Sequence, residues 1–260
     1  MNAYEKVLAA RQKDRPTAMR YIQSLFEDFV EMHGDRRFGD DAAIVAGIAA
    51  LNGRPVTVVG IEKGATTAEK VKRNFGSAHP EGYRKALRQM KLAEKFGRPV
   101  ICLVDTSGAY CGIGAEERGQ AQAIAENLYE MSALKTPILS VFIGEGGSGG
   151  ALGLAVADEV WMTENAVYSV ISPEGCASIL WKDPAKVADA AECLKMTAAD
   201  LYGLGVVDRI LLETGGDSVV FSTLKVLLAR KLRALCAVEP DELVRARYNR
   251  FRAFGDFLTL

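Results

Sequence analysis

The sequence has few of the residues on which metal binding and nucleophilic catalysis usually depend. It contains only two histidines, His33 and His79, and five cysteines, no two of which stand at C-x-x-C spacing. Structural zinc sites draw on such pairs, so we expect no metal site in this chain. The cysteine number is odd, and a chain of 260 residues can bury a large core without disulfides, so we expect reduced thiols.

Long apolar runs and a surplus of one charge are also absent. No apolar stretch approaches the ~18 residues that a membrane-spanning helix requires. The first residues are charged and lack the apolar segment of a secretory signal. The formal net charge of −1 argues against nucleic acid or an anionic membrane as the dominant partner. We therefore expect a cytoplasmic globular protein.

Glycine, by contrast, is concentrated at one point, since residues 143–151 read IGEGGSGGA. The apolar run 138–143 predicts a buried strand, and residues 151–157 predict the start of a helix. The first N–H groups of a helix have no partner within it, and the helix dipole favours negative charge there. The turn is therefore predicted to hold an anion by backbone donors, either a phosphate or a transient oxyanion.

Two known motifs overlap this run, and the surrounding sequence supports neither. Gly144, Gly146 and Gly149 fit the dinucleotide fingerprint, but only about seven residues separate them from the next predicted strand, too few for the helix of that motif. Ser148 stands between Gly146 and Gly150 as in the nucleophile elbow of hydrolases. A serine nucleophile needs a base, and both histidines lie far upstream. A hydrolase is thus disfavoured.

Two other segments allow both a structural and a functional interpretation. Residues 105–112 (DTSGAYCG) follow a predicted buried strand at 100–104. They form either a plain turn into the next helix or a pocket wall facing the glycine-rich turn. Lys63, Lys70, Lys72 and Arg73 form a basic cluster, which is either a solvated surface or a guide for an anionic substrate or partner.

The remaining pattern predicts one α/β domain. Strands and helices alternate through the middle of the chain, which favours parallel pairing through right-handed crossovers. Asn52-Gly53, between apolar runs at 42–51 and 55–61, predicts a hairpin. The other predicted elements are helical structure at 1–33, helices at 80–96, 115–134, 217–238 and 241–254, and strands at 159–162, 167–170 and 206–212.

Seven segments of the chain match those of one known family. They are HGDR at 33–36, KRNFG at 72–76, PEGYRKAL at 80–87, GAEERGQ at 114–120, the glycine run at 143–151, YSVISPEGCASILWK at 168–182 and RYNR at 247–250. The segment at 168–182 is the most specific of these. Through these segments, which occur in the family's order and with few gaps, the chain from Ala9 to Gly255 resembles the α subunit of the carboxyltransferase component of bacterial acetyl-CoA carboxylase.

The resemblance implies a crotonase-like α/β fold of repeated β-β-α units. It divides the single domain, residues 1–260, into an N-terminal helical extension at 1–33, a core at 34–212 and C-terminal helices at 213–260. The implied reaction transfers the carboxyl group of carboxybiotin, borne on a separate biotin carboxyl carrier protein, to acetyl-CoA, giving malonyl-CoA for fatty acid synthesis. In this family the active site lies between α and β subunits of an α2β2 assembly, and the β subunit mainly binds the CoA thioester.

The implied reaction develops negative charge on carbonyl oxygens and needs no side-chain base. We therefore expect the N–H groups of Gly149 and Gly150 to act as oxyanion donors, with Gly147 and Ala151 beside them. The opposite wall and the guidance of substrate are expected from Ser107, Gly108, Ala109, Tyr110, Gly112, Ile113, Lys63, Lys72 and Arg73.

The chain departs from the family at two positions of that loop. Ser107 and Cys111 stand where the family usually has proline, so we expect a more mobile loop carrying an oxidisable thiol. Three alternatives stay open on the sequence alone. They are a stand-alone crotonase-fold hydratase or isomerase acting on another acyl-CoA, a carboxyltransferase subunit for a different acyl-CoA such as propionyl-CoA, and a non-catalytic scaffold for a partner subunit.

Overall fold

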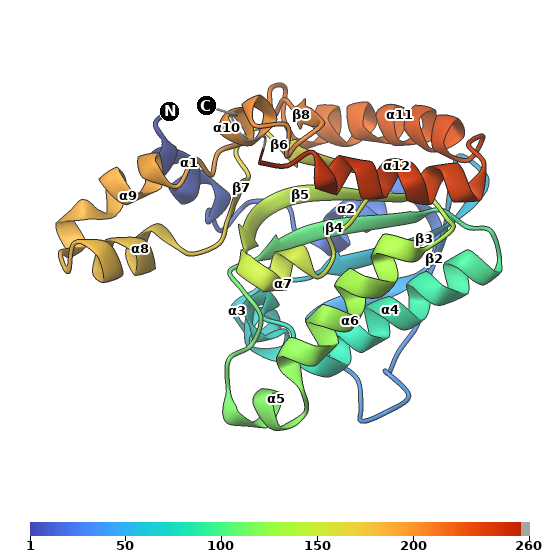
Figure 1. The fold of residues 1–260 in the computed structure, drawn as a ribbon, viewed down its shortest axis with the longest axis horizontal. Coiled ribbons are helices and arrows are strands. Elements are labelled where there is room, and N and C mark those ends of the chain that lie inside the picture. The colour runs from blue at the N-terminus through green and yellow to red at the C-terminus, as the bar shows by residue number, and fades with distance from the viewer. Residues whose placement is uncertain (256–260) are drawn as a thin grey trace.

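An eight-stranded sheet runs through the molecule, with helices packed on both of its faces (Figure 1). The computed structural model describes residues 1–255, so the end of the predicted C-terminal segment, 256–260, lies outside the described residues. The strands are β1 (Glu27–Glu31), β2 (Ile44–Leu51), β3 (Arg54–Ile61), β4 (Val100–Thr106), β5 (Ile138–Gly147), β6 (Glu159–Thr163), β7 (Val167–Ser169) and β8 (Arg209–Leu211). The sheet order is β1-β2-β3-β4-β5-β6-β8, with β7 paired to the end of β5.

Helices fill the connections between these strands. In chain order they are α1 (Ala3–Ala10), α2 (Ala18–Leu25), α3 (Thr67–Lys72), α4 (Pro80–Lys95), α5 (Ile113–Glu117), α6 (Gln120–Ala133), α7 (Ser148–Leu152), α8 (Pro173–Leu180), α9 (Val187–Cys193), α10 (Ala198–Gly203), α11 (Asp217–Leu235) and α12 (Pro240–Arg252), with short 3-10 turns η1 (Asn74–Gly76) and η2 (Pro184–Lys186). None of them, within residues 1–255, combines the length and the apolar character needed to cross a bilayer.

The predicted hairpin and the predicted parallel pairing are both confirmed. β2 and β3 pair antiparallel, and the turn between them places Asn52 and Gly53 at φ of 50° and 76°. Positive φ at both central residues is what a tight hairpin turn requires. From β3 onward the neighbours β3-β4, β4-β5, β5-β6 and β6-β8 are parallel.

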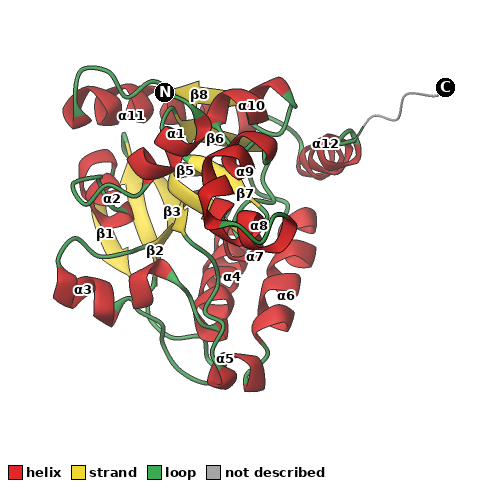
Figure 2. Cartoon of the chain, turned by 90° about the vertical axis from the view of Figure 1, so that its left-hand side faces the viewer, coloured by secondary structure: helices red, strands yellow, loops and turns green. Residues whose placement is uncertain are grey.

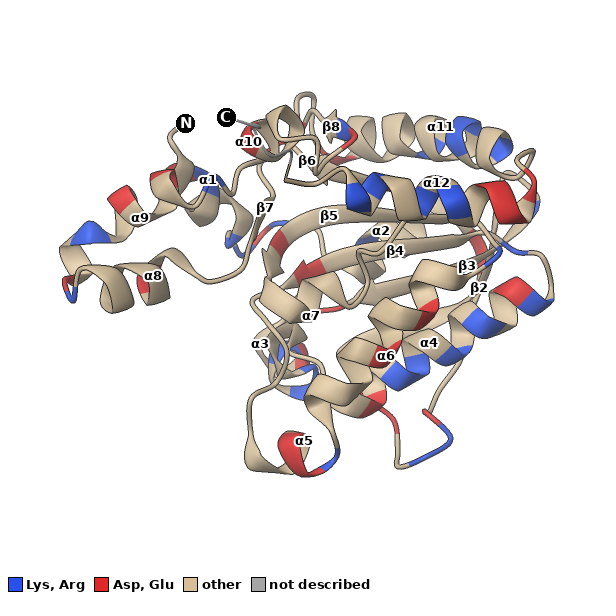
Figure 3. Ribbon diagram, viewed as in Figure 1, with Lys and Arg blue, Asp and Glu red and all other residues tan. Residues whose placement is uncertain are grey.

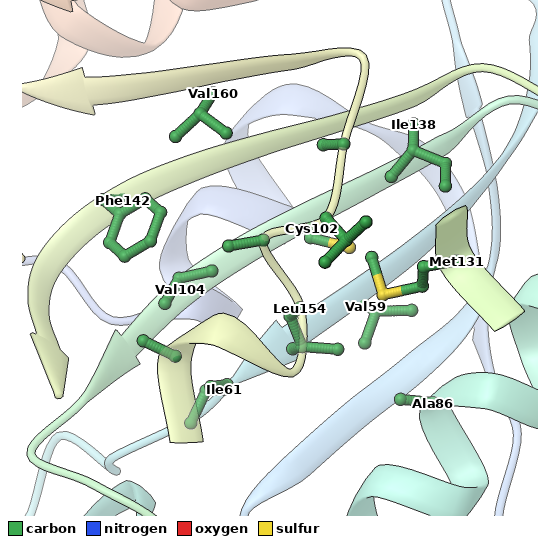
Figure 4. Packing of buried hydrophobic residues seen from close by; sticks show 14 of the residues in the cluster. Val59, Ile61, Ala86, Cys102, Val104, Met131, Ile138, Phe142, Leu154 and Val160 are labelled. Carbon is green, nitrogen blue, oxygen red and sulfur yellow. The ribbon is translucent and has the colours of Figure 1, made fainter. Parts of the chain in front are cut away.

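The core lies in two layers, one on each face of the sheet (Figure 2). On one face the strands pack against α4, α6 and α7, where Cys102 lies near Met131 and Leu154 and Phe142 belongs to the same cluster (Figure 4). On the other face they pack against α2 and α11. β4 is buried at every one of its positions, as expected for a central strand covered on both sides.

A buried arginine fixes the last helix. Arg247 of α12 is 1% exposed, and its guanidinium pairs with Asp158 while donating to the carbonyl oxygens of Met131, Leu134 and Thr136. Burial raises the pKa of Asp158, and the charge of Arg247 lowers it. The effect of burial is larger, so the pKa of Asp158 lies above its ordinary value. This contact joins the C-terminal helix to the loops before β5 and β6.

Four of the sequence-based boundaries were wrong. The segment 1–33 is not helical throughout, because residues 27–31 form β1 on the open edge of β2. The predicted helix 115–134 is divided at Gly119, whose φ is 80°. The predicted helix 151–157 is replaced by α7, which begins at Ser148 and ends at Leu152. The predicted strand 206–212 is reduced to β8.

Residues 170–196 leave the sheet and form a projecting pair of helices, α8 and α9 (Figure 1, left). Ser172 caps α8 by accepting a hydrogen bond from the N–H of Gly175, and Pro173 occupies the first turn, where its missing N–H costs no hydrogen bond. Val7 and Ala10 of α1 pack against this excursion through Ala191 and Met196. The N-terminal helix therefore supports the α8–α9 pair.

Candidate active site at the glycine-rich turn

The two loops singled out in the sequence meet at one edge of the sheet. β4 and β5 are parallel neighbours, so the loop that follows Thr106 and the turn that follows Gly147 lie at the same end of the sheet. In α/β folds this carboxyl edge is where ligands bind. The functional interpretation of residues 105–112, a wall beside the glycine-rich turn, agrees with this placement.

Three of the glycines allow backbone to pack against backbone or carboxylate. A Cβ on Gly147 would overlap the carbonyl of Ser107, and one on Gly144 would overlap the carboxylate of Asp105. At Gly150 a Cβ would lie 2.5 Å from the backbone nitrogen of Ala109. The loop is thus pressed directly onto the turn at these positions, and side chains there would force the two apart.

Gly149 is different, because the space in front of it is open. A Cβ on Gly149 would meet nothing closer than Ile124, at 3.9 Å. Gly149 lines a cleft of about 320 Å³ together with Ser148, Leu152 and Tyr168. Within residues 1–255 the N–H groups of Gly149 and Gly150 donate to no protein acceptor.

The four predicted donors are therefore not equivalent. Gly149 lines the cleft, whereas Gly147 lines a smaller adjoining hollow of about 40 Å³ with Ser107 and Arg11. Gly150 and Ala151 are buried behind them, and the carbonyl of Gly150 accepts a hydrogen bond from the hydroxyl of Tyr83 at 3.2 Å. Gly149 is the donor that a ligand in the cleft would reach first.

The cleft offers no side-chain base. Its lining residues are Ser148, Gly149, Leu152, Tyr168, Ser169, Val170, Leu194 and Leu201. Burial raises the pKa of Tyr168 to about 12, so its hydroxyl keeps its proton at neutral pH. Ser148 is exposed at φ 49°, the strained backbone of a strand-to-helix turn, but neither histidine lines the cleft. The arrangement suits charge stabilisation by the main chain rather than proton abstraction by a side chain.

A chain of charged side chains, in which Asp105 is buried and Lys63 and Glu145 are partly buried, supports the turn. The ammonium of Lys63 lies 2.7 Å from Asp105 and 3.0 Å from Glu145, and Glu145 also pairs with Arg11 at 2.7 Å. Burial opposes the charge on Lys63, but the two carboxylates outweigh it and hold its pKa above the ordinary value. Burial likewise opposes ionisation of Glu145, yet Lys63 and Arg11 keep the pKa of Glu145 below its ordinary value. Glu145 is consequently ionised and paired, and it is a poor base.

This network also connects the turn to the projecting helices. Arg11, at the end of α1, donates to Glu145 and to Glu174 in the first turn of α8, each at 2.7 Å. Sequence reasoning missed both Arg11 and Glu174. No local signal could have found them, because the contacting residues lie far apart in the chain.

The predicted basic cluster is only partly a surface feature. Lys63 is held by its two carboxylates, and Arg73 donates to the carbonyl oxygen of Ala42 at 2.8 Å. Lys72 is exposed and has no carboxylate partner among the described residues. Of the three basic residues assigned to substrate, Lys72 alone is free to contact one.

The loop after β4 is fixed at Tyr110 and exposed beyond it. The ring of Tyr110 stacks on His79 with centroids 4.2 Å apart. The backbone N–H of Tyr110 donates to the carbonyl oxygen of Ala78, and the carbonyl oxygen of Tyr110 accepts a hydrogen bond from the side-chain amide of Gln120. Gly112 packs against the Tyr110 ring, and Ile113 is 79% exposed at the start of α5. The loop wall beside the glycines therefore comprises Ser107, Gly108 and Ala109, while Gly112 and Ile113 follow the anchored Tyr110.

Replacing Cys111 by proline is expected to stabilise the protein by about 0.4–1 kcal/mol, because proline restricts the unfolded chain. Cys111 is exposed and its N–H donates no hydrogen bond within residues 1–255, so no bond is lost. Denaturant unfolding of the wild type and Cys111→Pro checks this. A variant less stable than the wild type would show that the loop backbone at 111 does not accept proline.

The fold has counterparts among solved structures. The chain superposes on transcarboxylase 12S, solved with methylmalonyl-coenzyme A and methylmalonic acid bound, with a TM-score of 0.73 and 20% identity over 90% of this chain and 44% of that one. It superposes on the β subunit of geranyl-CoA carboxylase from P. aeruginosa with a TM-score of 0.68 and 16% identity, over 92% and 46% of the two chains. The fold is thus the crotonase-like fold of carboxyltransferases, as the resemblance implied.

Sequence comparison makes the assignment more specific. Residues 1–255 match the family described as acetyl co-enzyme A carboxylase carboxyltransferase-like. The subunit alpha of acetyl-coenzyme A carboxylase carboxyl transferase from Ruminiclostridium cellulolyticum is 64% identical over 98% of both chains, and that from Clostridium acetobutylicum is 55% identical over 99% of this chain and 96% of the other. The chain belongs to the family of acetyl-CoA carboxylase carboxyltransferase α subunits.

Proposed function

We propose that the chain, paired with a carboxyltransferase β subunit, transfers the carboxyl group of carboxybiotin to acetyl-CoA and so forms malonyl-CoA for fatty acid synthesis in the cytoplasm. The biotin is borne on a separate carrier protein, and the assembly is an α2β2 heterotetramer. The observation that carries the proposal is the unpaired N–H of Gly149, a residue that lines a cleft without a side-chain base.

The residues of the cleft fit a flat, neutral ring with one polar oxygen. Leu152, Leu194 and Leu201 supply apolar walls, and the open space in front of Gly149 admits an atom that a Cβ would exclude. When bound, carboxybiotin supplies the carboxyl group and, on losing it, a ureido oxygen anion able to take a proton from the thioester. No metal takes part in this proposal.

The chain's own part in the reaction is to stabilise negative oxygen. The N–H of Gly149, with that of Gly150 behind it, donates to the oxygen as its charge develops, and the apolar walls keep water away. One such donor contributes about 3–4 kcal/mol in other enzymes. The donor turn is held in place by the ion pairs that Lys63 makes with Asp105 and Glu145. None of these three side chains exchanges a proton during the reaction.

The proposed β partner would complete a cleft that is open on one side. Val170, on the cleft wall, is 77% exposed, and the end of α8 presents Ile179, Leu180 and Trp181 to solvent. Exposed apolar side chains, on the cleft wall and on the projecting helix α8, are typical of a surface that a partner covers. The β subunit, placed there, would bring the CoA thioester to the ring.

The test is carboxyl transfer by the α–β complex with a biotinylated carrier, measured with several acyl-CoA substrates. We expect malonyl-CoA from acetyl-CoA, at a higher kcat/KM than the product from propionyl-CoA. A higher kcat/KM for propionyl-CoA would assign the subunit to that substrate instead. Hydration of an enoyl-CoA by the chain alone, without transfer in the complex, would overturn the proposal in favour of a stand-alone enzyme.

A further inference from the structure

A further cavity lies away from the glycine-rich turn. It measures about 660 Å³ and lies between α4, α6 and the loop 33–39. It shares no lining residue with either cleft at the turn. Six of its lining residues are basic and three are acidic, so the cavity has an excess of positive charge although the whole chain carries a net charge of −1.

The basic residues form a stripe on one helix face. Arg84, Arg88, Lys91 and Lys95 follow one another at steps of four, three and four along α4, the spacing that places side chains on one face. Arg36, in the loop beside the helix, lines the same cavity. Figure 3 shows the basic residues recurring along α4 and in the adjoining loop.

All three acidic residues of the cavity are already paired. Asp35 binds Arg84 at 2.7 Å and accepts three backbone N–H groups of its own loop. Glu126 pairs with Arg37, and Glu130 pairs with Lys91. Arg36, Arg88 and Lys95 have no carboxylate partner among residues 1–255. The surplus charge therefore resides on these three.

Two of the unpaired cations converge on a single atom. Arg36 and Arg88 both donate to the carbonyl oxygen of His33, at 2.9 and 3.0 Å. Burial, together with the neighbouring charge of Arg36, lowers the pKa of Arg88. Two guanidinium groups at one neutral oxygen repel each other, and a bound anion would remove that repulsion through charge-assisted hydrogen bonds.

We propose that this cavity is a binding site for a small organic phosphate, whose phosphate group lies between Arg36 and Arg88. Arginine is suited to phosphate because its planar guanidinium donates two parallel hydrogen bonds. The volume matches that of small-molecule sites, and Leu87 and Leu92 in the lining contact an apolar portion of the ligand. The site is independent of the proposed carboxyl transfer, since it shares no residue with the glycine-rich turn.

The test is calorimetric titration of the full-length chain with pyrophosphate at constant ionic strength. We expect saturable binding that Arg36→Gln and Arg88→Gln each weaken about tenfold or more, because each removes a charge-assisted contact. Arg36→Lys, which keeps the charge, is expected to bind more tightly than Arg36→Gln. Arg20→Gln is the matched control, since Arg20 is an exposed arginine on α2, which packs on the opposite face of the sheet.

Absence of saturable binding, or an equal loss in Arg20→Gln, would overturn the proposal by showing that only diffuse charge is involved. Unchanged thermal unfolding of Arg36→Gln shows that its loss of binding does not come from misfolding. Comparison of CoA with dephospho-CoA identifies the source of the phosphate. Tighter binding of CoA assigns its 3′-phosphate to the site, and equal binding of the two assigns their shared diphosphate. Binding of pyrophosphate without binding of either CoA compound assigns a separate organic phosphate. Because no carboxyl transfer is measured, failure here leaves the proposed function standing.

Discussion

Replacing Gly149 by valine is expected to lower kcat for carboxyl transfer by about 10²–10³-fold, the usual loss when an oxyanion donor is removed. The branched side chain would fill part of the open space beside Gly149, which the reacting oxygen needs. The fold should persist, because the nearest atom to a Cβ at this position is 3.9 Å away. Steady-state kinetics of the α–β complex, together with thermal unfolding, measures both effects.

Gly203→Val is the matched control for this change. Gly203 also lies in a short helix, α10, and a Cβ there meets no atom within 4 Å. It should keep the wild-type rate. A normal rate in Gly149→Val would instead support the interpretation of the chain as a non-catalytic scaffold.

Gly150 does not offer the same test, although no sequence pattern distinguishes the two glycines. A Cβ at Gly150 would lie 2.5 Å from the backbone of Ala109, so any side chain there displaces the loop after β4. Loss of activity in Gly150→Val would therefore report the position of the loop as much as the loss of a donor. At Gly149 a side chain can block the donor without displacing the loop, so a loss of activity there reports on catalysis alone.

Replacing Lys63 by methionine is expected to destabilise the protein by about 3–5 kcal/mol at neutral pH, the usual cost of breaking a buried ion pair. Without the ammonium, the carboxylates of Asp105 and Glu145 would remain close together and poorly solvated. Denaturant unfolding measures the difference. Lys135→Met, which breaks an exposed pair with Asp241, should leave the free energy of unfolding nearly unchanged.

The destabilisation in Lys63→Met is expected to depend on pH. Lys63 helps to lower the pKa of Glu145, so its contribution to stability is present above the ordinary carboxyl value of 4.5 and is lost as pH falls through the lowered pKa. The difference between wild type and variant should therefore shrink below about pH 4.5. A difference that stays constant from neutral to acid pH would show that the ion pair contributes little.

Features set by adjacent residues could be predicted from the sequence. The Asn52-Gly53 turn, the buried strand before the glycine run and the Ser172-Pro173 cap each depend on local backbone preference. β1 could not be predicted, because residues 27–31 continue the apolar spacing of the preceding helix. What makes them a strand is the open edge of β2, a partner that local periodicity does not contain.

The candidate site shows the same limit. The glycine run identified where backbone donors would be, but the roles of its members depend on the loop after β4. Gly147 and Gly150 pack against that loop, and only Gly149 has an open face. Lys63 is a second example. The sequence places it in a basic cluster, whereas in the fold its ammonium lies between the carboxylates of Asp105 and Glu145. Contacts between distant segments decide both cases.

The central claim is that the N–H of Gly149 stabilises negative charge on an oxygen in a cleft without a side-chain base. The most direct measurement replaces that single amide by an ester, by incorporating glycolic acid at position 149, which removes the N–H and adds no side chain. We predict that kcat of the α–β complex falls about 10²-fold or more, with little change in thermal stability. A kcat equal to that of the wild type would contradict the account.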